Sequence, residues 1–379
     1  MKHVAWIVAA TVFCAPPAFA QTPADAARAA MTQLESAAQR LDDADSARDR
    51  VRALTQSVQA FETGLAAMRD GLRVASIRES ELRRELDARE AEVTRLLAAL
   101  AALGSSSGPQ AFVHPQGAVG AARAGLLMAS VTPALSDAAA DLRLDVEEAT
   151  FLRQLQQDAA NTLRTGLVGV QTARTALSQA MADRTDLPRK FTEDPVRTAL
   201  LIAASETLDG FASGLTQITE GEANVDLPTV SNRKGDFPLP VAGQILRRAG
   251  ETDAAGITRP GILVATRPRA LVTTPVAATI RYRGPLLDYG LVTILEPEPD
   301  ILFVFAGLET VFGETGQVLP IDSPVGLMGG FEDATGDFLS PSSERTGAAL
   351  SETLYIEVRQ GDTPEDPLGW FADDKGMTE

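Results

Sequence analysis

The feature that most constrains this chain is a long run of apolar residues spaced alternately three and four positions apart. The run begins at Val51 and reaches Leu103, interrupted only by Glu79 and Arg89. This spacing is typical of the seam of a left-handed coiled coil. The same spacing recurs one residue out of phase at Met31, Leu34, Ala38 and Leu41. We therefore predict a long helix with a local change of register between residues 42 and 50.

A second helical stripe supplies a partner for the first. Glycine and serine residues at 104–108 are expected to end the first helix, and a connector that contains His114 follows. Apolar residues then keep a helical period from about Leu135 to Met181, although Gly166 and Gly169 weaken it. The pattern favours an antiparallel coiled-coil hairpin over residues 21–185. Dimerisation through the first helix is the alternative, and His114 is expected to be a loop residue with no special role.

The N-terminus has the pattern of a secretory signal peptide over residues 1–20. Lys2 and His3 precede an apolar stretch, Val4–Cys14, that is too short to span a bilayer. An Ala-x-Ala site ends at Ala20, so the mature chain is expected to begin at Gln21 in the periplasm. Cys14 raises the alternative of a lipoprotein, but the three residues before it lack the small side chains that lipidation requires. After cleavage no cysteine remains for disulfides or metal binding.

The composition excludes some partners. The formal net charge is −17, so phosphate backbones would repel the chain and nucleic acid is not an expected ligand. After signal cleavage, no stretch approaches the ~20 apolar residues that a membrane-spanning helix needs. We therefore expect no integral membrane segment.

A third helical region lies within residues 186–232, which we interpret as a regulatory arm and linker. Residues 196–219 form an amphipathic stretch that is out of phase with the coiled coil. Its apolar face must be covered, either by the domain that follows or by a partner. The residues proposed for that face include Leu200, Ala203, Leu208, Phe211 and Leu215.

From Phe237 the pattern changes to short β-branched runs between glycine and proline residues. The runs are 261–265, 271–272, 276–282, 291–295, 301–305, 324–328 and 353–359. They predict an all-β domain, sandwich-like or barrel-like, over residues 233–371, followed by a disordered tail at 372–379. The fold class is therefore α+β and multi-domain, with a long antiparallel α-helical coiled coil, a linking helix and a C-terminal β domain.

Several motifs of this β region resemble LytM-type (lysostaphin-like) peptidase domains. They occur in the family's order over the C-terminal third of the chain: Phe237–Gly243, Pro275–Tyr282, Asp288–Gly290, Glu314–Gln317, Pro324–Gly326, Leu354–Arg359 and Asp366–Pro367. One departure is Thr279, which stands where the family usually has glycine. The resemblance implies the LytM-like fold.

The residues that this family uses for zinc chemistry are missing. Active members hold zinc with histidine and aspartate, and further histidines assist the reaction. At the matching positions this chain has Arg259, Leu263, Gly307, Thr353 and Tyr355. The whole chain contains two histidines, His3 and His114, and neither lies in the β region. Zinc hydrolysis needs three protein donors and an open position, so we predict a pseudo-peptidase with no metal and no cofactor.

A coiled coil joined to a degenerate LytM-type domain resembles the EnvC-type murein hydrolase activators. The resemblance implies a non-catalytic periplasmic activator of N-acetylmuramoyl-L-alanine amidases, which split septal peptidoglycan during cell division and cell separation. It also implies that an FtsX-like membrane protein of an FtsEX-type complex engages the coiled coil. A regulatory helix between the two regions would restrain the amidase-binding groove, and residues 196–219 occupy the matching position.

The degenerate cleft is a candidate partner-binding groove. Replacement of polar ligands by Leu263, Gly307 and Tyr355, beside Thr353, would turn a metal cleft into an apolar trough suited to a partner helix. Three arginines, Arg259, Arg281 and Arg283, are placed to steer an acidic segment towards it. The alternative is that these residues merely fill an inactive cavity.

Other functions are weighed against activation. A working peptidase would need metal ligands, which the sequence does not supply. An efflux-pump adaptor would have strands on both sides of the hairpin, whereas this chain begins helical after its signal. A passive periplasmic scaffold, which binds peptidoglycan or division proteins without activating an enzyme, is the main alternative.

Overall fold

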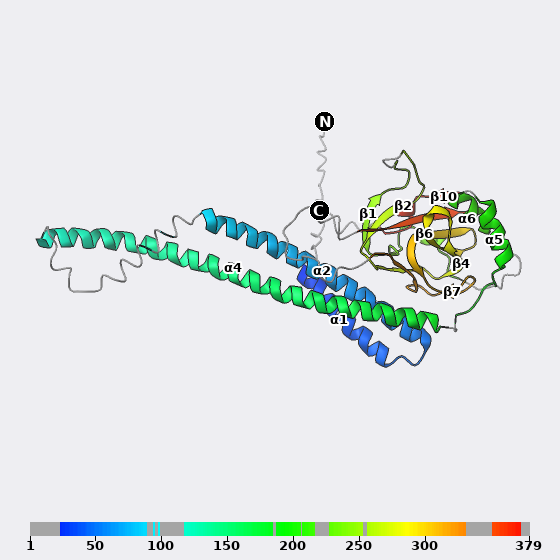
Figure 1. Cartoon of the computed structure of the whole chain (residues 1–379), viewed down its shortest axis with the longest axis horizontal. Coiled ribbons are helices and arrows are strands. Elements are labelled where there is room, and N and C mark those ends of the chain that lie inside the picture. Colours follow the sequence, from blue (N-terminus) through cyan, green and yellow to red (C-terminus); the bar gives the residue numbers. More distant parts are fainter. Residues whose placement is uncertain are drawn as a thin grey trace, which may run out of the picture.

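The chain forms a long pair of helices that carries a β domain at one end (Figure 1). The structure, a computed structural model, describes residues 23–88, 94, 98, 117–184, 187–205, 207–216, 227–252, 256–330 and 351–372. The predicted signal peptide, the connector with His114 and residues 373–379 of the predicted tail lie outside the described residues. Within the described residues, no helix combines the length and the hydrophobicity needed to cross a membrane.

Helix α1 (Pro23–Asp42) and helix α2 (Ala47–Ala88) are two separate helices. The Ser46 hydroxyl accepts a hydrogen bond from the Asp49 N–H at 3.1 Å and donates one to the Asp49 carboxylate at 2.6 Å. The Ser46 hydroxyl therefore caps the first turn of a new helix. Near the end of α1, Arg40 donates to the Gln56 side chain of α2 at 2.6 Å. Where the sequence predicts a change of register, the chain therefore reverses, and α1 folds back against α2 (Figure 1).

Helix α4 (Gly117–Ala182) runs antiparallel to α2 and continues past the described end of α2 (Figure 1). The direction follows from two ion pairs, because Arg174 meets Glu62 at 2.8 Å and Arg78 meets Glu148 at 2.9 Å. Apolar positions of the predicted seam are buried between the two helices. They include Val51, Leu54, Val58, Leu65 and Leu72 of α2, and Leu167, Val170, Leu177 and Met181 of α4.

Two glycines allow α4 and α2 to approach closely. A Cβ atom at Gly166 would lie 2.8 Å from Leu65 Cδ2, and one at Gly169 would lie 2.7 Å from the Phe61 ring. Real Cβ atoms do not occupy such distances. Gly166 and Gly169, which lower the helix propensity of α4, therefore allow it to pack closely on α2. A larger side chain at either position would overpack this contact.

The β domain is an antiparallel sheet of ten strands. The strands are β1 (Gly243–Arg247), β2 (Ile262–Thr266), β3 (Leu271–Thr273), β4 (Ala278–Pro285), β5 (Leu291–Glu298), β6 (Ile301–Val311), β7 (Val318–Leu319), β8 (Pro324–Met328), β9 (Glu352–Gln360) and β10 (Thr363–Glu365). Their order is β1-β2-β9-β6-β5-β4-β7, while β10 pairs with β9, and β8 pairs with both β3 and β6. Each of the seven predicted runs coincides with a strand, whereas β1, β7 and β10 were not predicted.

Both faces of the central strands are apolar. Alternate residues of a strand point to opposite sides of the sheet, so each face has its own set of buried side chains. One face forms the larger core, which includes Ile356 of β9, Phe303 of β6 and the C-terminal Trp370. The opposite face, called here the outer face, carries Tyr282, Val292, Ile294, Leu302, Val304 and Tyr355, with Leu263 partly buried beside them.

The helical pair and the β domain share a third apolar cluster. Leu271, Phe312 and Leu327 of the β domain pack against the seam residues of α2 and α4. Glu62 of α2 joins the three elements, because one of its carboxylate oxygens accepts hydrogen bonds from Arg174 of α4 and from the Leu271 N–H of β3, the latter at 3.1 Å. The base of the helical pair is thus fixed to β3.

Candidate functional site

Two short helices cover the outer face of the sheet. Helix α5 (Pro195–Ala204) begins after Asp194, whose side chain accepts hydrogen bonds from the N–H groups of Val196 and Arg197. Helix α6 (Leu208–Thr216) begins after Thr207, whose hydroxyl accepts from the Gly210 N–H at 3.1 Å. Both starts satisfy N–H groups that the first helical turn leaves without a partner.

Helix α6 lays one apolar stripe on the outer face. Leu208, Phe211, Ala212 and Leu215 are all buried, at the spacing that places side chains on one side of a helix. The Phe211 ring meets the edge of the Tyr282 ring with centroids 4.7 Å apart. Three residues proposed for the regulatory face, Leu208, Phe211 and Leu215, thus lie against the sheet.

The other two proposed residues of that face lie elsewhere. The predicted stretch 196–219 is divided, because Ser205 has extended backbone and its N–H bonds to Ile202 O, which ends α5. As a result Leu200 is 68% exposed and Ala203 is exposed. Helix α5 instead directs Leu201 and Ile202 towards the outer face. Assigning one helical phase across a break misplaced these two side chains.

The predicted groove residues of β2, β6 and β9 come together on the sheet, where Tyr355 and Leu263 share the apolar cluster of α6, while Gly307 and Thr353 are exposed. Leu263 and Tyr355 are direct cross-strand partners, and Ala306 pairs with Tyr355 from the other side. The next residue along β6, Gly307, has a φ of +92°, and a Cβ there would lie 2.8 Å from the Thr353 carbonyl oxygen. Glycine is required at this close approach, since other residues would be strained and would collide.

Arg259 joins this group through aromatic contacts. Its guanidinium lies 5.7 Å from the centroid of the Tyr289 ring. The Tyr289 ring in turn lies 5.8 Å from the Tyr355 ring, centroid to centroid. The sequence did not single out Tyr289 as a site residue, although its Asp-Tyr-Gly motif was noted. Five predicted residues, Arg259, Leu263, Gly307, Thr353 and Tyr355, therefore occupy one region of the sheet.

Arg281 and Arg283 contact other parts of the molecule. Arg281 is buried, lies 3.6 Å from Glu296 and stacks over the Phe191 ring at 5.0 Å. Arg283 is exposed and lines a cavity of about 240 Å³ beside the end of α4, together with Met181 and Glu314. The structure thus brings neither residue to Tyr355.

A buried polar chain runs along β9 below α6. The Tyr355 hydroxyl accepts from the Gly261 N–H at 3.1 Å and donates to Glu357 at 2.7 Å. The other oxygen of Glu357 accepts from Arg359 Nη1 at 2.8 Å, and Arg359 Nη2 donates to the Ser213 hydroxyl of α6 at 3.2 Å. The alternating polar residues of β9 gave a signal for this chain, whereas nothing in the sequence pointed to Ser213.

The electrostatics of this chain keep the tyrosine neutral. Burial raises the pKa of the Tyr355 hydroxyl well above its ordinary value, and the neighbouring Glu357 raises it further. The hydroxyl therefore stays protonated and acts as a donor to Glu357. The carboxylate of Glu357 is held between this hydroxyl and the Arg359 guanidinium, which is the arrangement that a buried charge needs.

These residues do not suit a zinc ion. A tetrahedral zinc site takes histidine, thiolate or carboxylate donors. Leu263 presents alkyl carbon, Gly307 has no side chain, and the Tyr355 hydroxyl is a protonated group engaged with Gly261 and Glu357. Among the described residues, no group of three or more His, Cys, Asp or Glu is placed to hold a metal.

Comparison with models of known protein families finds no match. A curated relative, the uncharacterized protein NMB1333 of Neisseria meningitidis serogroup B, is 22% identical over 166 residues. The match covers 41% of this chain and 25% of the relative, so the chain spans about a quarter of that protein's length.

Three solved structures illustrate the partial likenesses of this chain. Csd3 of Helicobacter pylori has a TM-score of 0.29 and 15% identity, covering 37% of this chain and 34% of that chain. A zinc-containing peptidase of Vibrio cholerae has a TM-score of 0.28 and 18% identity, covering 36% and 40%. Lysostaphin has a TM-score of 0.29 and 12% identity, covering 38% and 59%. The likenesses cover little more than a third of this chain, and the activities of those proteins are not transferred to it.

Proposed function

We propose that this chain is a non-catalytic, EnvC-type activator of peptidoglycan amidases, exported to the periplasm and acting at the division septum. The observation that carries the proposal is the position of α6. This helix packs on the outer face in the same apolar cluster as Tyr355 and Leu263, two positions where the LytM-type resemblance expects residues of the zinc site, and neither position carries a zinc donor. An apolar face that cannot hold zinc, and that α6 could cover and uncover, suits the binding of a partner helix.

The cover has the properties expected of a regulatory element. Helix α6 is nine residues long and is joined to α5 by a break, so it can leave without unfolding a long helix. Helix α5 exposes Val196 and Leu200, at 75% and 68%. In the proposed resting state, α6 restrains the groove formed by Leu263, Tyr355 and their neighbours. Displacement of α6 would free the groove for the amidase.

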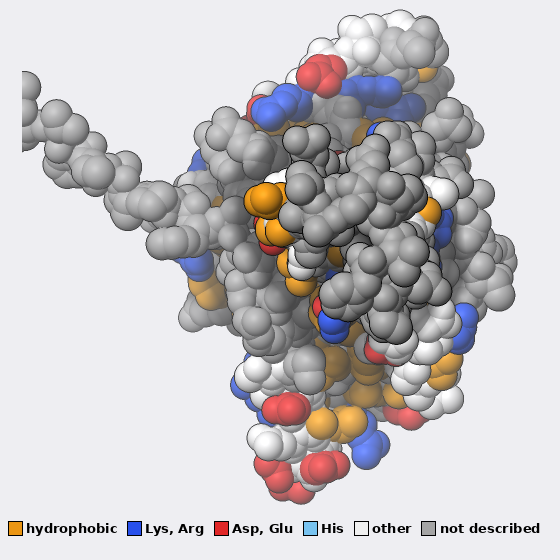
Figure 2. Space-filling view, turned by 90° about the vertical axis from the view of Figure 1, so that its left-hand side faces the viewer, with side chains coloured by type: hydrophobic (Ala, Val, Ile, Leu, Met, Phe, Trp, Pro, Cys, Tyr) orange, Lys and Arg blue, Asp and Glu red, His pale blue; other side chains and the backbone are white. Residues whose placement is uncertain are grey.

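The helical pair is proposed to act as a coiled coil that receives the signal from an FtsX-like membrane protein. Several large apolar side chains on α4 are exposed, including Leu126, Leu144 and Phe151 at 74%, 63% and 66%. Seen along the rod from its far end, hydrophobic side chains lie at the surface among acidic and basic ones (Figure 2). These side chains of α4 are accessible to a partner, and the docking role is proposed from them together with the resemblance.

The test is dye release from labelled peptidoglycan by a purified periplasmic amidase, with and without this chain. We expect no release by the chain alone, stimulation of the amidase by the chain, and stronger stimulation when residues 195–216 are deleted. Release by the chain alone that a chelator abolishes would contradict the loss of zinc chemistry. Absence of stimulation by the folded deletion variant, with the cognate amidase, would favour the passive scaffold.

A pair of substitutions tests whether the groove is the active surface. Leu263→Glu, made in the deletion variant, places a charge among apolar residues and should abolish stimulation. Leu246→Glu is the matched control, because Leu246 of β1 is 57% exposed and lies outside the groove residues. Equal loss of stimulation in both variants would count against a specific groove.

A further inference from the structure

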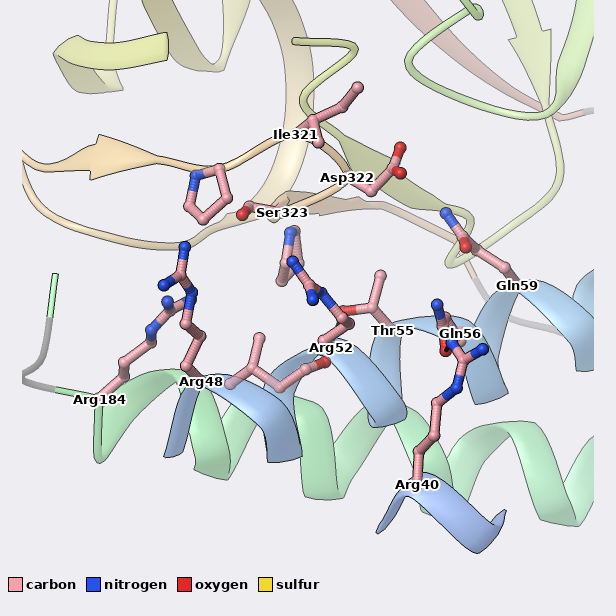
Figure 3. Close-up of a pocket in the computed structure, with 13 residues that line it drawn as sticks. Arg40, Arg48, Arg52, Thr55, Gln56, Gln59, Arg184, Ile321, Asp322 and Ser323 are labelled. Atoms are coloured by element: carbon pink, nitrogen blue, oxygen red, sulfur yellow. Dashed lines mark hydrogen bonds between the residues drawn. The ribbon is translucent and has the colours of Figure 1, made fainter. Parts of the chain in front are cut away.

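A cavity of about 280 Å³ lies where the base of the helical pair meets the β domain (Figure 3). Its wall comes from α1, from the first turns of α2, from the residues after α4 and from the loop between β7 and β8. The loop contributes Pro320–Pro324, and α2 contributes Val51, Thr55, Gln56 and Gln59 besides charged residues. The cavity therefore lies at the junction of the two parts of the molecule, away from α6.

Arginines dominate the lining of this cavity. Arg40 comes from α1, Arg48 and Arg52 from α2, and Arg184 from the end of the α4 segment. Figure 3 shows Arg48, Arg52 and Arg184 rising from the helices towards the loop that carries Ile321, Asp322 and Ser323. Among the described lining residues, Asp322 is the one carboxylate. Four arginines and one aspartate thus line the cavity, and Arg40 also donates to the Gln56 side chain.

This concentration of positive charge has a physical cost that an anion would remove. Like charges around one cavity repel each other, and the repulsion is stronger where water is excluded. Arg184 is 7% exposed, whereas Arg40, Arg48 and Arg52 are exposed and present their guanidinium groups to an incoming ligand. Arg48 and Arg52 also lie near the N-terminus of α2, where the helix dipole adds positive potential. The cavity is therefore a favourable site for a multiply charged anion.

The side chains favour phosphate over a single carboxylate. The planar fork of a guanidinium binds phosphate oxygens with two parallel hydrogen bonds. A phosphoryl group carries about −1.5 to −2 charges and three acceptor oxygens, so it can engage several arginines at once. We propose that this arginine cavity is a binding site for a terminal phosphate group, carried either by a free phosphorylated compound or by the phosphomonoester headgroup of a lipid such as phosphatidic acid.

Occupancy would tie the helical pair to the β domain. The ligand would bridge guanidinium groups of α1, α2 and the end of α4, with the Ser323 hydroxyl on the β7–β8 loop beside it. A ligand that binds the assembled site and not its separated parts stabilises the assembly. This site is independent of the amidase proposal, because it uses none of the groove residues.

Calorimetric titration of the full chain with inorganic pyrophosphate tests the site. We expect saturable binding that weakens at higher ionic strength and raises the midpoint of thermal unfolding. Arg52→Ala should weaken binding about tenfold, since it removes a charged hydrogen-bond donor. Arg73→Ala is the matched control on the exposed surface of α2 outside the cavity, and it should leave affinity unchanged.

Asp322→Asn gives a prediction of opposite sign. It removes the acidic group of the lining while keeping a residue that tolerates the φ of +60° found there. Pyrophosphate should bind severalfold more tightly to this variant, a gain that misfolding cannot produce. Lack of saturable binding to the wild-type chain, or affinities unchanged in both Arg52→Ala and Asp322→Asn, would overturn the proposal.

Vesicle sedimentation separates the two sources of the phosphate group. Binding to phosphatidic acid vesicles that pyrophosphate and Arg52→Ala both abolish would assign the site to a lipid headgroup. Pyrophosphate binding without vesicle binding would assign it to a free phosphorylated compound. Vesicle binding that Arg52→Ala leaves intact, without pyrophosphate binding, would overturn the site.

Discussion

The β domain is covered by helices in two places, and the two covers are held by different physics. At one edge, α2 and α4 pack on Leu271, Phe312 and Leu327, and the buried pair of Glu62 and Arg174 is tied to the β3 backbone. On the outer face, α6 packs its apolar stripe on the sheet, and its Ser213 hydroxyl accepts a hydrogen bond from Arg359.

The difference lies in what remains after separation. Removal of the helical pair from β3 would leave the Leu271 N–H without its Glu62 acceptor and would expose Leu271, Phe312 and Leu327, while Glu62 and Arg174 would stay paired between the helices. Removal of α6 would leave Arg359 bound to Glu357 at 2.8 Å and to the Asp362 carbonyl at 2.7 Å. The charge below α6 is therefore satisfied without α6. We therefore propose that the helical pair is the fixed cover, called here the fixed joint, and that α6 is the detachable one.

The largest effect is expected from breaking the fixed joint. Glu62→Ala takes from the buried Arg174 its carboxylate partner and should lower the free energy of unfolding by about 3–5 kcal/mol. The measurement is urea unfolding followed by circular dichroism. Glu148→Ala is the control, because its pair with Arg78 is exposed at 40% and 50% and should contribute at most about 1 kcal/mol.

Glu62→Gln serves if the alanine variant does not fold. The amide oxygen can still accept from the Leu271 N–H, while the charge is lost, so the variant should fall between wild type and Glu62→Ala. Equal stability of Glu62→Ala and Glu148→Ala would mean that the joint rests on apolar packing alone.

The next effect concerns the detachable cover. Phe211→Ala removes a fully buried ring that meets Tyr282, and it should weaken the packing of α6 by about 3–5 kcal/mol. Hydrogen exchange should show loss of protection in residues 208–216, with α2 and α4 unaffected. Leu200→Ala on exposed α5 is the control. Loss of protection throughout the β domain would show that α6 is part of the core, and the contrast between the two covers would fail.

Periodic apolar patterns predicted the elements well. The seven β-branched runs are strands, and the 3-4 spacing of α2 marks residues that are buried against α4. These helices and strands could be predicted because the residues buried on one face recur in the sequence with the period of the helix or the strand. The position of the chain reversal at Ser46 was not readable from phase alone, since a shift of register and a turn produce the same change of pattern.

The candidate site was predicted only where the sequence could supply a template. The structure brings Arg259, Leu263, Gly307, Thr353 and Tyr355 into one region, and all but Arg259 lie on strands that the sequence runs and family motifs indicated. Arg281, Arg283, Leu200 and Ala203 were assigned from nearness in sequence or a continued helical phase, and a bulge or a helix break redirects such side chains. Contacts between distant segments, such as Ser213 with Arg359 or Glu62 with β3, leave no periodic trace.

A smaller effect tests the polar contact of the detachable cover. Ser213→Ala removes an acceptor from Arg359, which keeps its bonds to Glu357 and Asp362, so the cost should be about 0.5–1.5 kcal/mol. Hydrogen exchange of α6 should rise severalfold without a change in global unfolding. Thr207→Ala, which removes the cap of the same helix, is a useful comparison. A cost as large as that of Phe211→Ala would mean that Arg359 depends on α6 and that the cover is fixed.

The smallest effect is expected at Lys234, whose contacts attach the chain to the β domain after the detachable helix α6. Lys234 donates to Glu365 at 2.7 Å and stacks 4.4 Å from the Trp370 ring centroid, while Trp370 Nε1 donates to the same carboxylate at 2.8 Å. The hydrogen bond from Lys234 lowers the pKa of Glu365, against the opposing effect of burial. These contacts clamp the start of the β domain to its C-terminal end.

A lowered pKa gives a definite pH dependence. Glu365 has its ordinary pKa of about 4.3 in the unfolded chain and a lower one in the folded chain, so its contribution is complete above the unfolded value. The contribution is lost as pH falls through the folded pKa. Glu365→Gln keeps an acceptor for Trp370, and it should lower the free energy of unfolding by at most about 1 kcal/mol near pH 7 because the pair is partly exposed. The difference from wild type should vanish in acid, as urea unfolding at a series of pH values would show. A difference that persists in acid would assign the contribution to packing of the Glu365 side chain instead of its charge. The contacts between Lys234, Glu365 and Trp370 would then stabilise the fold independently of pH.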